Sequence, residues 1–255
     1  TISCNVAPSG WDVAAIKLNM ASPRIENNII SQNEGDGVWG VDSQSCPVII
    51  GNVMENNGRF PYCHPPAGRF IYQGNVVKGN GYQAIGIQGR DDCRIDRDTI
   101  WKKEELPYLV VWYGITVDEG KILVIVPGVV VKFMDMSYYK AGLLIKENMV
   151  ANGTKDKPIV FTSMYDDSAG SKTINLEGFK DRIPYPGSWG EIVFVGGRGT
   201  LTNCYVRYGG NGLRLQNNDS ADNRYVIRNS DIRYNSAAGV TNAGSACNEL
   251  VMEGC

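Results

Sequence analysis

One six-residue motif, here called the phrase, occurs four times near the start of the chain: Ile2-Ser3-Cys4-Asn5-Val6-Ala7, Ile25-Glu26-Asn27-Asn28-Ile29-Ile30, Ile49-Ile50-Gly51-Asn52-Val53-Met54 and Tyr72-Gln73-Gly74-Asn75-Val76-Val77. Their shared asparagines, Asn5, Asn28, Asn52 and Asn75, are spaced by 23, 24 and 23 residues. A fixed period of this size indicates a solenoid, in which each repeat packs on the next one.

Each phrase has apolar residues on both sides of its asparagine, and a second turn former follows five positions later. These second positions are Gly10, Asn33, Asn57 and Asn80. Asn and Gly tolerate the left-handed backbone conformation of sharp bends, so the pattern predicts short strands joined by turns. Strands of successive repeats would then pair in parallel, about 4.8 Å apart. An asparagine at the same place on every coil predicts a ladder of side-chain hydrogen bonds along the axis.

The same phase continues toward the C-terminus. Asp98-Thr99-Ile100 follows Asn75 by 23 residues, and the phrases around Asn203 and Asn229 match each other. This register places Cys204, Ser230 and Cys255 at ladder positions. A β-sandwich with irregular strands is the alternative, but its strands do not repeat a polar residue at a fixed phase.

The pattern changes between about residues 106 and 199, where short apolar runs alternate with Gly and Pro turns. The runs include the stretches 123–133 and 158–163, followed by Asp166-Asp167 and Trp189-Gly190-Glu191-Ile192. Over roughly residues 106–195 this string resembles a module of secreted right-handed parallel β-helix proteins of bacteria and archaea. Lys146-Glu147-Asn148-Met149 departs from the module, which usually has a small residue there. The resemblance implies the same fold here, and such modules occur in surface proteins, adhesins and polysaccharide-active enzymes.

We therefore expect an all-β, right-handed parallel β-helix of about ten coils. Residues 1–105 would form repeats with the asparagine ladder, 106–199 the module with Pro-Gly-Val and Phe-Thr-Ser strands, and 200–255 further coils. All three parts would belong to one continuous solenoid, with a junction near residues 101–106.

Composition excludes two classes of function. The net charge of −2 gives no electrostatic basis for binding nucleic acid. No run of about 20 apolar residues is present, so we expect no membrane-spanning helix. The chain begins at Thr1 without an initiator Met or a signal peptide. We expect either that a leader has been removed or that the chain is part of a longer one.

The seven cysteines contain no C-x-x-C pair, and His64 is the only histidine. This pattern argues against structural zinc and favours an oxidising, extracellular or cell-surface setting. Asn152 and Asn218 begin sequons and are candidate glycosylation sites.

Coil register limits which cysteines can form disulfides. Cys46 with Cys93, and Cys204 with Cys255, would lie two coils apart, about 9–10 Å, beyond the roughly 7 Å limit for a bridge. Cys63 could pair with Cys46 or Cys93, and Cys247 with Cys255. Cys4 could pair with Cys255 of a neighbouring copy, which makes six of the seven cysteines disulfide candidates.

Evidence for catalysis in the sequence is weak. Asp91-Asp92-Cys93 resembles the Asp-Asp-Cys string of polygalacturonases, but the other motifs of that family are absent and His64 is predicted in a loop. Asp91 and Asp92 are therefore weak catalytic candidates, with a solvated turn as the alternative. Asp166 and Asp167 form the best acidic pair and could bind structural calcium, or could cap backbone amides in a turn. No other cofactor is expected.

The leading interpretation is a non-catalytic, extracellular structural or surface protein. Neither end shows a capping element, so we expect stacking of copies head to tail into a filament or sheath, or flanking parts of a longer adhesin-like chain. The alternative is a polysaccharide lyase, a glycosidase-like enzyme or a carbohydrate-binding module. Exposed aromatic residues could stack on sugars or pack between coils; the candidates are Trp39, Tyr82, Tyr138 and Tyr139.

Overall fold

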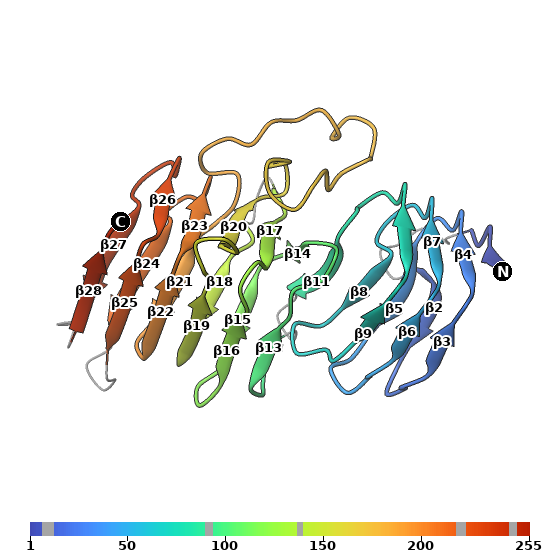
Figure 1. Ribbon diagram of the computed structural model, residues 1–255, viewed down its shortest axis with the longest axis horizontal. Helices are drawn as coiled ribbons and strands as arrows, with labels where there is room; N and C mark the ends of the chain where they lie inside the picture. The colour runs from blue at the N-terminus through green and yellow to red at the C-terminus, as the bar shows by residue number, and fades with distance from the viewer. Residues whose placement is uncertain (7–12, 90–93, 137–139, 218–222, 245–248) are drawn as a thin grey trace.

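The computed structural model describes residues 1–6, 13–89, 94–136, 140–217, 223–244 and 249–255. These residues form 28 strands and no helix, stacked as one elongated parallel solenoid (Figure 1). Each coil gives one strand to each of three faces, and nine such coils follow strand β1. The predicted all-β parallel β-helix is confirmed, with nine coils in place of about ten. The described residues contain no helix that is long and apolar enough to cross a membrane.

Face 1 is a single uninterrupted sheet of nine parallel strands. In order along the axis they are β2 (Ala14–Leu18), β5 (Asp36–Gly40), β8 (Tyr62–His64), β11 (Ile85–Gly89), β14 (Tyr108–Trp112), β17 (Val130–Phe133), β20 (Ile159–Ser163), β23 (Cys204–Arg207) and β26 (Asp231–Arg233).

Face 2 is divided into two sheets, of three and six strands. The first contains β3 (Arg24–Glu26), β6 (Val48–Ile50) and β9 (Ile71–Gln73). The second contains β12 (Arg94–Ile95), β15 (Ile115–Val117), β18 (Leu143–Ile145), β21 (Ile192–Val195), β24 (Leu213–Asn217) and β27 (Val240–Gly244).

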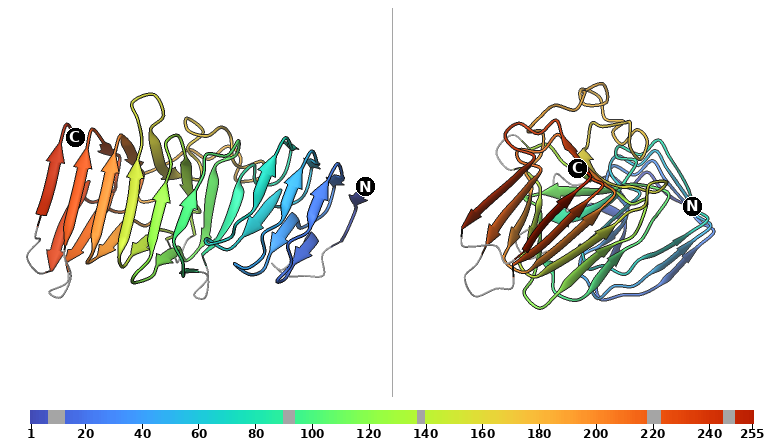
Figure 2. Two further views of the ribbon diagram at one scale, coloured as in Figure 1. Left: turned by 60° about the horizontal axis from the view of Figure 1, so that its bottom comes forward. Right: turned by 60° about the vertical axis from the view of Figure 1, so that its left-hand side comes forward.

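Face 3 is divided at the same level, into sheets of four and six strands. The first contains β1 (Ile2–Ser3), β4 (Ile29–Ser31), β7 (Val53–Glu55) and β10 (Val76–Lys78). The second contains β13 (Thr99–Trp101), β16 (Ile122–Ile125), β19 (Asn148–Asn152), β22 (Arg198–Thr202), β25 (Arg224–Arg228) and β28 (Glu249–Glu253). Figure 2 shows the strands of successive coils following one another along the axis.

Many corners of the solenoid are built from one left-handed residue followed directly by a ladder residue. The left-handed residues are Cys4, Asn27, Gln32, Gly51, Asn56, Gly74, Gly79, Asn203, Asn229 and Gly254. Asn and Gly dominate this set because they enter the left-handed region at least cost. The residue that bends the chain is therefore the one before each repeated asparagine.

Two asparagine ladders run along two different corners. Between faces 2 and 3, the Nδ2 atoms of Asn28 and Asn52 donate to the Oδ1 atoms of Asn52 and Asn75 at 3.3 and 3.1 Å. Between faces 3 and 1, the ladder contains Asn5, Asn33, Asn57 and Asn80, with equivalent distances of 2.7, 2.8 and 2.9 Å. The predicted side-chain ladder is thus confirmed, but as two ladders.

The sequence pattern predicted that Asn5 shares a ladder with Asn28, Asn52 and Asn75, and this prediction is wrong. The structure pairs Ile2 with Ile30, so Asn5 is level with Asn33 and not with Asn28. The two ladder residues Asn5 and Asn33 are 28 positions apart, whereas Asn33 and Asn57 are 24 apart. The first coil is longer than the coil that follows it, and the near-constant spacing of the asparagines concealed this.

The predicted ladder positions of Cys204 and Ser230 are confirmed. The backbone N–H of Cys204 donates to Ser230 Oγ at 3.1 Å, as each asparagine N–H donates to the next asparagine. Cys204 Sγ lies 3.2 Å from the Ala151 carbonyl oxygen of the preceding coil. Cys255 Sγ makes the same type of contact with Ile227 O at 3.5 Å. A thiol therefore replaces the asparagine amide at this corner.

The interior is a continuous column of apolar side chains, including Ile30, Ile87, Phe133 and Phe194, each 1% exposed or less. A second apolar cluster lies on the outer surface of face 1 and contains Phe60 and Leu109. Residues 164–191, here called the strap, join β20 to β21 and pass over this cluster (Figure 1).

The strap is held at two places on face 1. Lys132, which is fully buried, donates its ammonium protons to the carbonyl oxygens of Asp166 and Ser171, both at 2.9 Å. Further along the strap, Ile174 forms a bridge with Tyr82, which precedes β11, three coils nearer the N-terminus than β20. Burial lowers the pKa of Lys132 to about 8 against the opposing effect of Asp167 and Asp166. The strap thus braces the side of the solenoid where the strands never separate.

Pairing between coils is broken at one level. Strands β8, β11 and β14 pair continuously on face 1, but β9 ends one sheet and β12 begins another on face 2. The same break separates β10 from β13 on face 3. Two neighbouring coils therefore share one face and diverge on the other two.

Replacing a ladder asparagine should test how much the ladder stabilises the fold. Asn52 is fully buried, and its Nδ2 donates to Ile25 O at 2.8 Å and Ile50 O at 3.0 Å. Asn52→Ala leaves these carbonyls without their donor, so urea unfolding should show a loss of about 1–3 kcal/mol. Asn152→Ala, at an exposed position ending β19, is the control and should change little. Equal effects of the two changes would contradict the structural role of the ladder.

Candidate functional site

The break in pairing opens a cleft between the third and fourth coils, here called the junction cleft. It contains two cavities, of about 280 and 380 Å³. The first is lined by Tyr62, Tyr72, Gln73, Gly74, Asn75, Val77, Ile85, Lys103, Glu104, Glu105 and Leu106. The second is lined by His64, residues 67–72, residues 97–102, Glu104 and Tyr108. Tyr72 and Glu104 line both cavities.

Aromatic rings form the inner walls of the cleft. Tyr62 and Tyr72 have ring centroids 4.5 Å apart, and Trp101 stacks on Tyr108 at 5.4 Å. The indole N–H of Trp101 donates to Pro66 O at 3.2 Å and so links β13 to the loop that follows β8. These rings face inward because the apolar core of the solenoid continues across the break, although strand pairing on faces 2 and 3 does not.

Two tyrosine hydroxyls in the cleft are buried without a hydrogen-bond partner among the described residues. They belong to Tyr62, which is 2% exposed, and to Tyr72. Tyr108 differs, because its hydroxyl donates to Lys102 O at 2.9 Å. Burial is the main cause that raises the pKa of all three phenols, so they stay neutral. Leaving a buried hydroxyl without a partner costs roughly 1–3 kcal/mol of folding stability.

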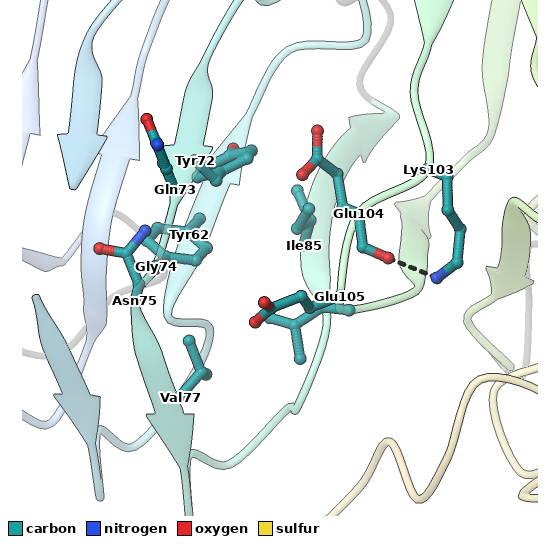
Figure 3. Close-up of a pocket in the computed structure, with 11 residues that line it drawn as sticks. Tyr62, Tyr72, Gln73, Gly74, Asn75, Val77, Ile85, Lys103, Glu104 and Glu105 are labelled. Carbon is teal, nitrogen blue, oxygen red and sulfur yellow. Dashed lines mark hydrogen bonds between the residues drawn. The ribbon is translucent and has the colours of Figure 1, made fainter. Parts of the chain in front are cut away.

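Carboxylates lie on the opposite wall of the first cavity. Figure 3 shows Glu104 and Glu105 together on one side, across from Tyr72, Gln73 and Asn75. Burial raises the pKa of Glu104, Lys102 and Lys103 oppose the shift, and Glu105 adds to it. Lys103 donates its ammonium proton to the backbone carbonyl of Glu104. The cavity therefore combines aromatic surface with acceptors for hydrogen bonds.

His64 was predicted in a loop, but it ends β8 and is only 4% exposed. Its Nδ1 lies 2.7 Å from Pro65 O and must carry the proton, because a carbonyl oxygen only accepts. Burial lowers the pKa of His64 to about 4, so the ring is neutral at physiological pH. His64 stacks on Phe70, with centroids 4.6 Å apart, and forms part of the second cavity.

The acidic pair that was considered for calcium lies far from the cleft, at the start of the strap. Asp166 accepts hydrogen bonds from the Thr162 hydroxyl at 2.7 Å and from the Ser168 backbone N–H at 3.1 Å. Burial raises its pKa, but these hydrogen bonds and Arg207, at 3.4 Å, hold it below the usual value. Asp167 is exposed. The described residues contain no cluster of three or more His, Cys, Asp or Glu that could hold a metal, so calcium stays a prediction.

Several predicted site residues lie outside the described residues: Asp91, Asp92, Cys93, Cys247, Asn218, Tyr138 and Tyr139. Cys4, Cys46, Cys63, Cys204 and Cys255 carry thiols, so Cys63 and Cys46 are not bridged to each other. Asn152 is exposed, as a glycosylation site requires.

Two of the aromatic candidates for sugar stacking have packing roles. Trp39 is 4% exposed and lies beneath the Lys17 ammonium, 4.4 Å from its ring centroid. Tyr82 stacks on Phe60 with centroids 4.6 Å apart. Inter-coil and surface packing, the alternative role, therefore applies to both.

Sequence reasoning missed the aromatic residues and the glutamates of the cleft. The repeat predicted Tyr72 at an apolar strand position, and the residue does lie in β9. The repeat gave no sign that its hydroxyl would be buried without a partner among the described residues. The available signal was the charged run Lys102-Lys103-Glu104-Glu105, which falls where the repeat is interrupted. A charged run at such an interruption indicates a loop leaving the regular coil.

A pair of tyrosine variants should separate the two kinds of hydroxyl in the cleft. Tyr62→Phe removes a hydroxyl that has no partner among the described residues, so the free energy of unfolding should stay the same or rise by about 1 kcal/mol. Tyr108→Phe removes a bonded hydroxyl and should lower it by about 1 kcal/mol. Chemical denaturation of both variants checks this. A loss in Tyr62→Phe as large as that in Tyr108→Phe would contradict the description of the cleft.

Comparisons with known proteins agree with the fold. No curated protein and no solved structure gives a significant match to this chain. Residues 1–125 match the family model described as right handed beta helix region. This match covers the ladder repeats, the junction cleft and the first coils beyond it. Residues 1–125 thus match the right-handed β-helix family, and the parallel coils of the same solenoid continue from there toward the C-terminus.

Proposed function

We propose that this protein is an extracellular, non-catalytic β-helix protein that binds carbohydrate in the junction cleft. The observation that carries the proposal is the lining of the first cavity, where the paired rings of Tyr62 and Tyr72 lie across from the carboxylates of Glu104 and Glu105 (Figure 3). A sugar ring has apolar faces that pack on aromatic rings and hydroxyls that pair with phenols and carboxylates. A cavity with apolar walls and a few convergent polar groups is the usual form of such a site.

The charges of the first cavity favour a neutral sugar there, whereas Arg69, Arg97 and Lys102 line the second cavity. Glu104 and Glu105 lie on one wall of the first cavity, and the Lys103 ammonium is bonded to the backbone of its own loop. A uronic acid would bring a third carboxylate next to these two, at a cost from like-charge repulsion. Neutral hydroxyls instead provide donors for the glutamate oxygens.

The arrangement of the carboxylates supports binding without hydrolysis. Glycosidases use two carboxyl groups that flank the scissile bond. Glu104 and Glu105 are adjacent residues on one wall, and the facing wall of the first cavity carries Tyr72, Gln73 and Asn75 (Figure 3). A sugar between these walls would meet carboxylates on one side only.

Isothermal titration calorimetry with neutral and acidic glycans tests the proposal. Soluble oligosaccharides of cellulose, xylan, mannan and chitin are the neutral set, with oligogalacturonate and alginate as acidic controls. Tyr72→Ala removes a ring shared by both cavities and should weaken binding of the neutral ligand at least about tenfold. Tyr234→Ala, a half-exposed tyrosine in the ninth coil, is the matched control and should have no effect. Failure of every neutral glycan to bind would refute the proposal.

End-to-end contact with other copies, or with further coils of a longer chain, remains a second proposal. Leu250 and Met252 lie level with the buried Tyr225 and Ile227, yet they are 38% and 47% exposed. Another coil placed against β28 would bury these side chains. Asn5 and Cys255 also follow left-handed residues in equivalent bends, which would let the ladder continue between copies.

Cross-linking through the terminal cysteines tests this contact. If copies stack, mild oxidation should give Cys4–Cys255 dimers and higher species on non-reducing electrophoresis. Cys255→Ser should abolish them, whereas Cys46→Ser should not. Monomer alone after oxidation would argue against stacking, and electron micrographs of the same material would show whether any assembly is ordered.

A further inference from the structure

The second cavity of the junction cleft differs from the first in its charges. Three cationic side chains line it, and they come from both sides of the break in pairing. Arg69 lies between β8 and β9 in the third coil, Arg97 lies between β12 and β13 in the fourth, and Lys102 directly follows β13. Asp98 and Glu104 are the acidic residues of the lining. Cations therefore outnumber carboxylates around this cavity.

Two of the three cations have no counter-charge of their own. Arg97 donates to Ser43 Oγ at 3.1 Å and pairs with Asp96 at 3.1 Å. Arg69 and Lys102 are exposed, and neither side chain forms a hydrogen bond or an ion pair with any described residue. The charges of these two side chains are therefore available to a bound anion.

The cavity also presents apolar surface that the break leaves open. Ile71 of β9 pairs only with Val48, and Ile100 of β13 pairs only with Val124, because each strand is the end strand of its sheet. Ile71 is 51% exposed and Ile100 is 58% exposed, whereas both valines are half-buried. Phe70 adds a half-buried ring to the same lining. An apolar group that covers these side chains would be stabilised by roughly 25 cal/mol per Å² removed from water.

We propose that the second cavity binds a small aromatic carboxylate. The ring of the ligand would lie against Ile71, Ile100 and Phe70, and its carboxylate would meet Arg69 and Lys102. The guanidinium of an arginine is a planar fork of donors that matches the two oxygens of a carboxylate.

The size of the cavity agrees with such a ligand. Its volume of about 380 Å³ is at the lower end of the range of roughly 300–1,000 Å³ for ligand pockets, which suits one ring with a short acidic side chain. This ligand differs from the neutral sugar of the first cavity, so the inference goes beyond the proposed function and does not rest on it.

A neutral ring and an inorganic anion are the two alternatives, and each fits only part of the lining. A neutral ring would leave Arg69 and Lys102 without a counter-charge. Inorganic phosphate would pair with them but would leave Ile71 and Ile100 exposed to water. A ligand that has both a ring and a carboxylate fits the apolar and the cationic side chains together.

Ligand-observed NMR titration with three probes tests the inference. The probes are 3-phenylpropanoate, its neutral isostere 3-phenylpropanamide, and inorganic phosphate. We expect 3-phenylpropanoate to bind at least about tenfold more tightly than either, because the amide lacks the charge and phosphate lacks the apolar body. Equal affinity for the amide would show that the cations do not recognise the ligand, and equal affinity for phosphate would show that the apolar side chains do not. Either result would overturn the inference.

Variants locate the site. Arg69→Gln combined with Lys102→Gln should weaken 3-phenylpropanoate about tenfold and leave the amide unchanged. Ile71→Thr keeps a β-branched side chain in β9 and should weaken both ring-containing probes. Arg233→Gln removes an exposed arginine of the ninth coil and is the matched control, which should change neither. Unfolding curves confirm that each variant is folded.

The outcomes for the two cavities are distinguishable. Absence of 3-phenylpropanoate binding, or binding that the double variant leaves unchanged, would overturn the inference. Neither result bears on the first cavity, because neutral glycans are measured separately. Failure of every neutral glycan to bind, with 3-phenylpropanoate still bound, would refute the proposed function and support the inference.

Discussion

Parallel pairing of each coil with the next is the constraint on which the rest of this structure depends. Backbone hydrogen bonds fix neighbouring strands about 4.8 Å apart, so every side chain lies directly above its counterpart in the preceding coil. This stacking places Asn52 above Asn28 and Cys204 level with Ser230. It also explains why the corners use Asn and Gly, since each bend must occur at the same height and in the same direction.

The candidate site exists because pairing between coils is continuous on face 1 but interrupted on faces 2 and 3. Face 1 stays paired from β2 to β26, and the strap braces its outer surface. On the other faces the third and fourth coils separate, and rings that would lie within a closed core become the walls of a cleft. Tyr62 and Tyr72 keep polar groups there that a regular coil would have no reason to bury. A binding site thus arises from an interruption of the repeat and not from an added domain.

The sequence predicted the parts of the fold that depend on local repetition. Asn28, Asn52 and Asn75 gave the period and the ladder, and Cys204 and Ser230 were placed in the correct positions. Asn5 was misplaced because a longer first coil kept nearly the same asparagine spacing while changing the corner. The cleft was not predicted, because Tyr72 and Trp101 read as ordinary apolar positions. Only the break in pairing between two coils, a tertiary feature, shows that Tyr72 lines a cleft and that its hydroxyl lacks a partner among the described residues.

Hydrogen–deuterium exchange with and without the neutral oligosaccharide tests the central claim most directly, that the break between coils is the binding site. Glycan bound in the cleft should slow exchange in residues 71–78 and 97–106, on both sides of the break, and leave β25 and β28 unchanged. Protection confined to one wall, or located on another part of the solenoid, would contradict it.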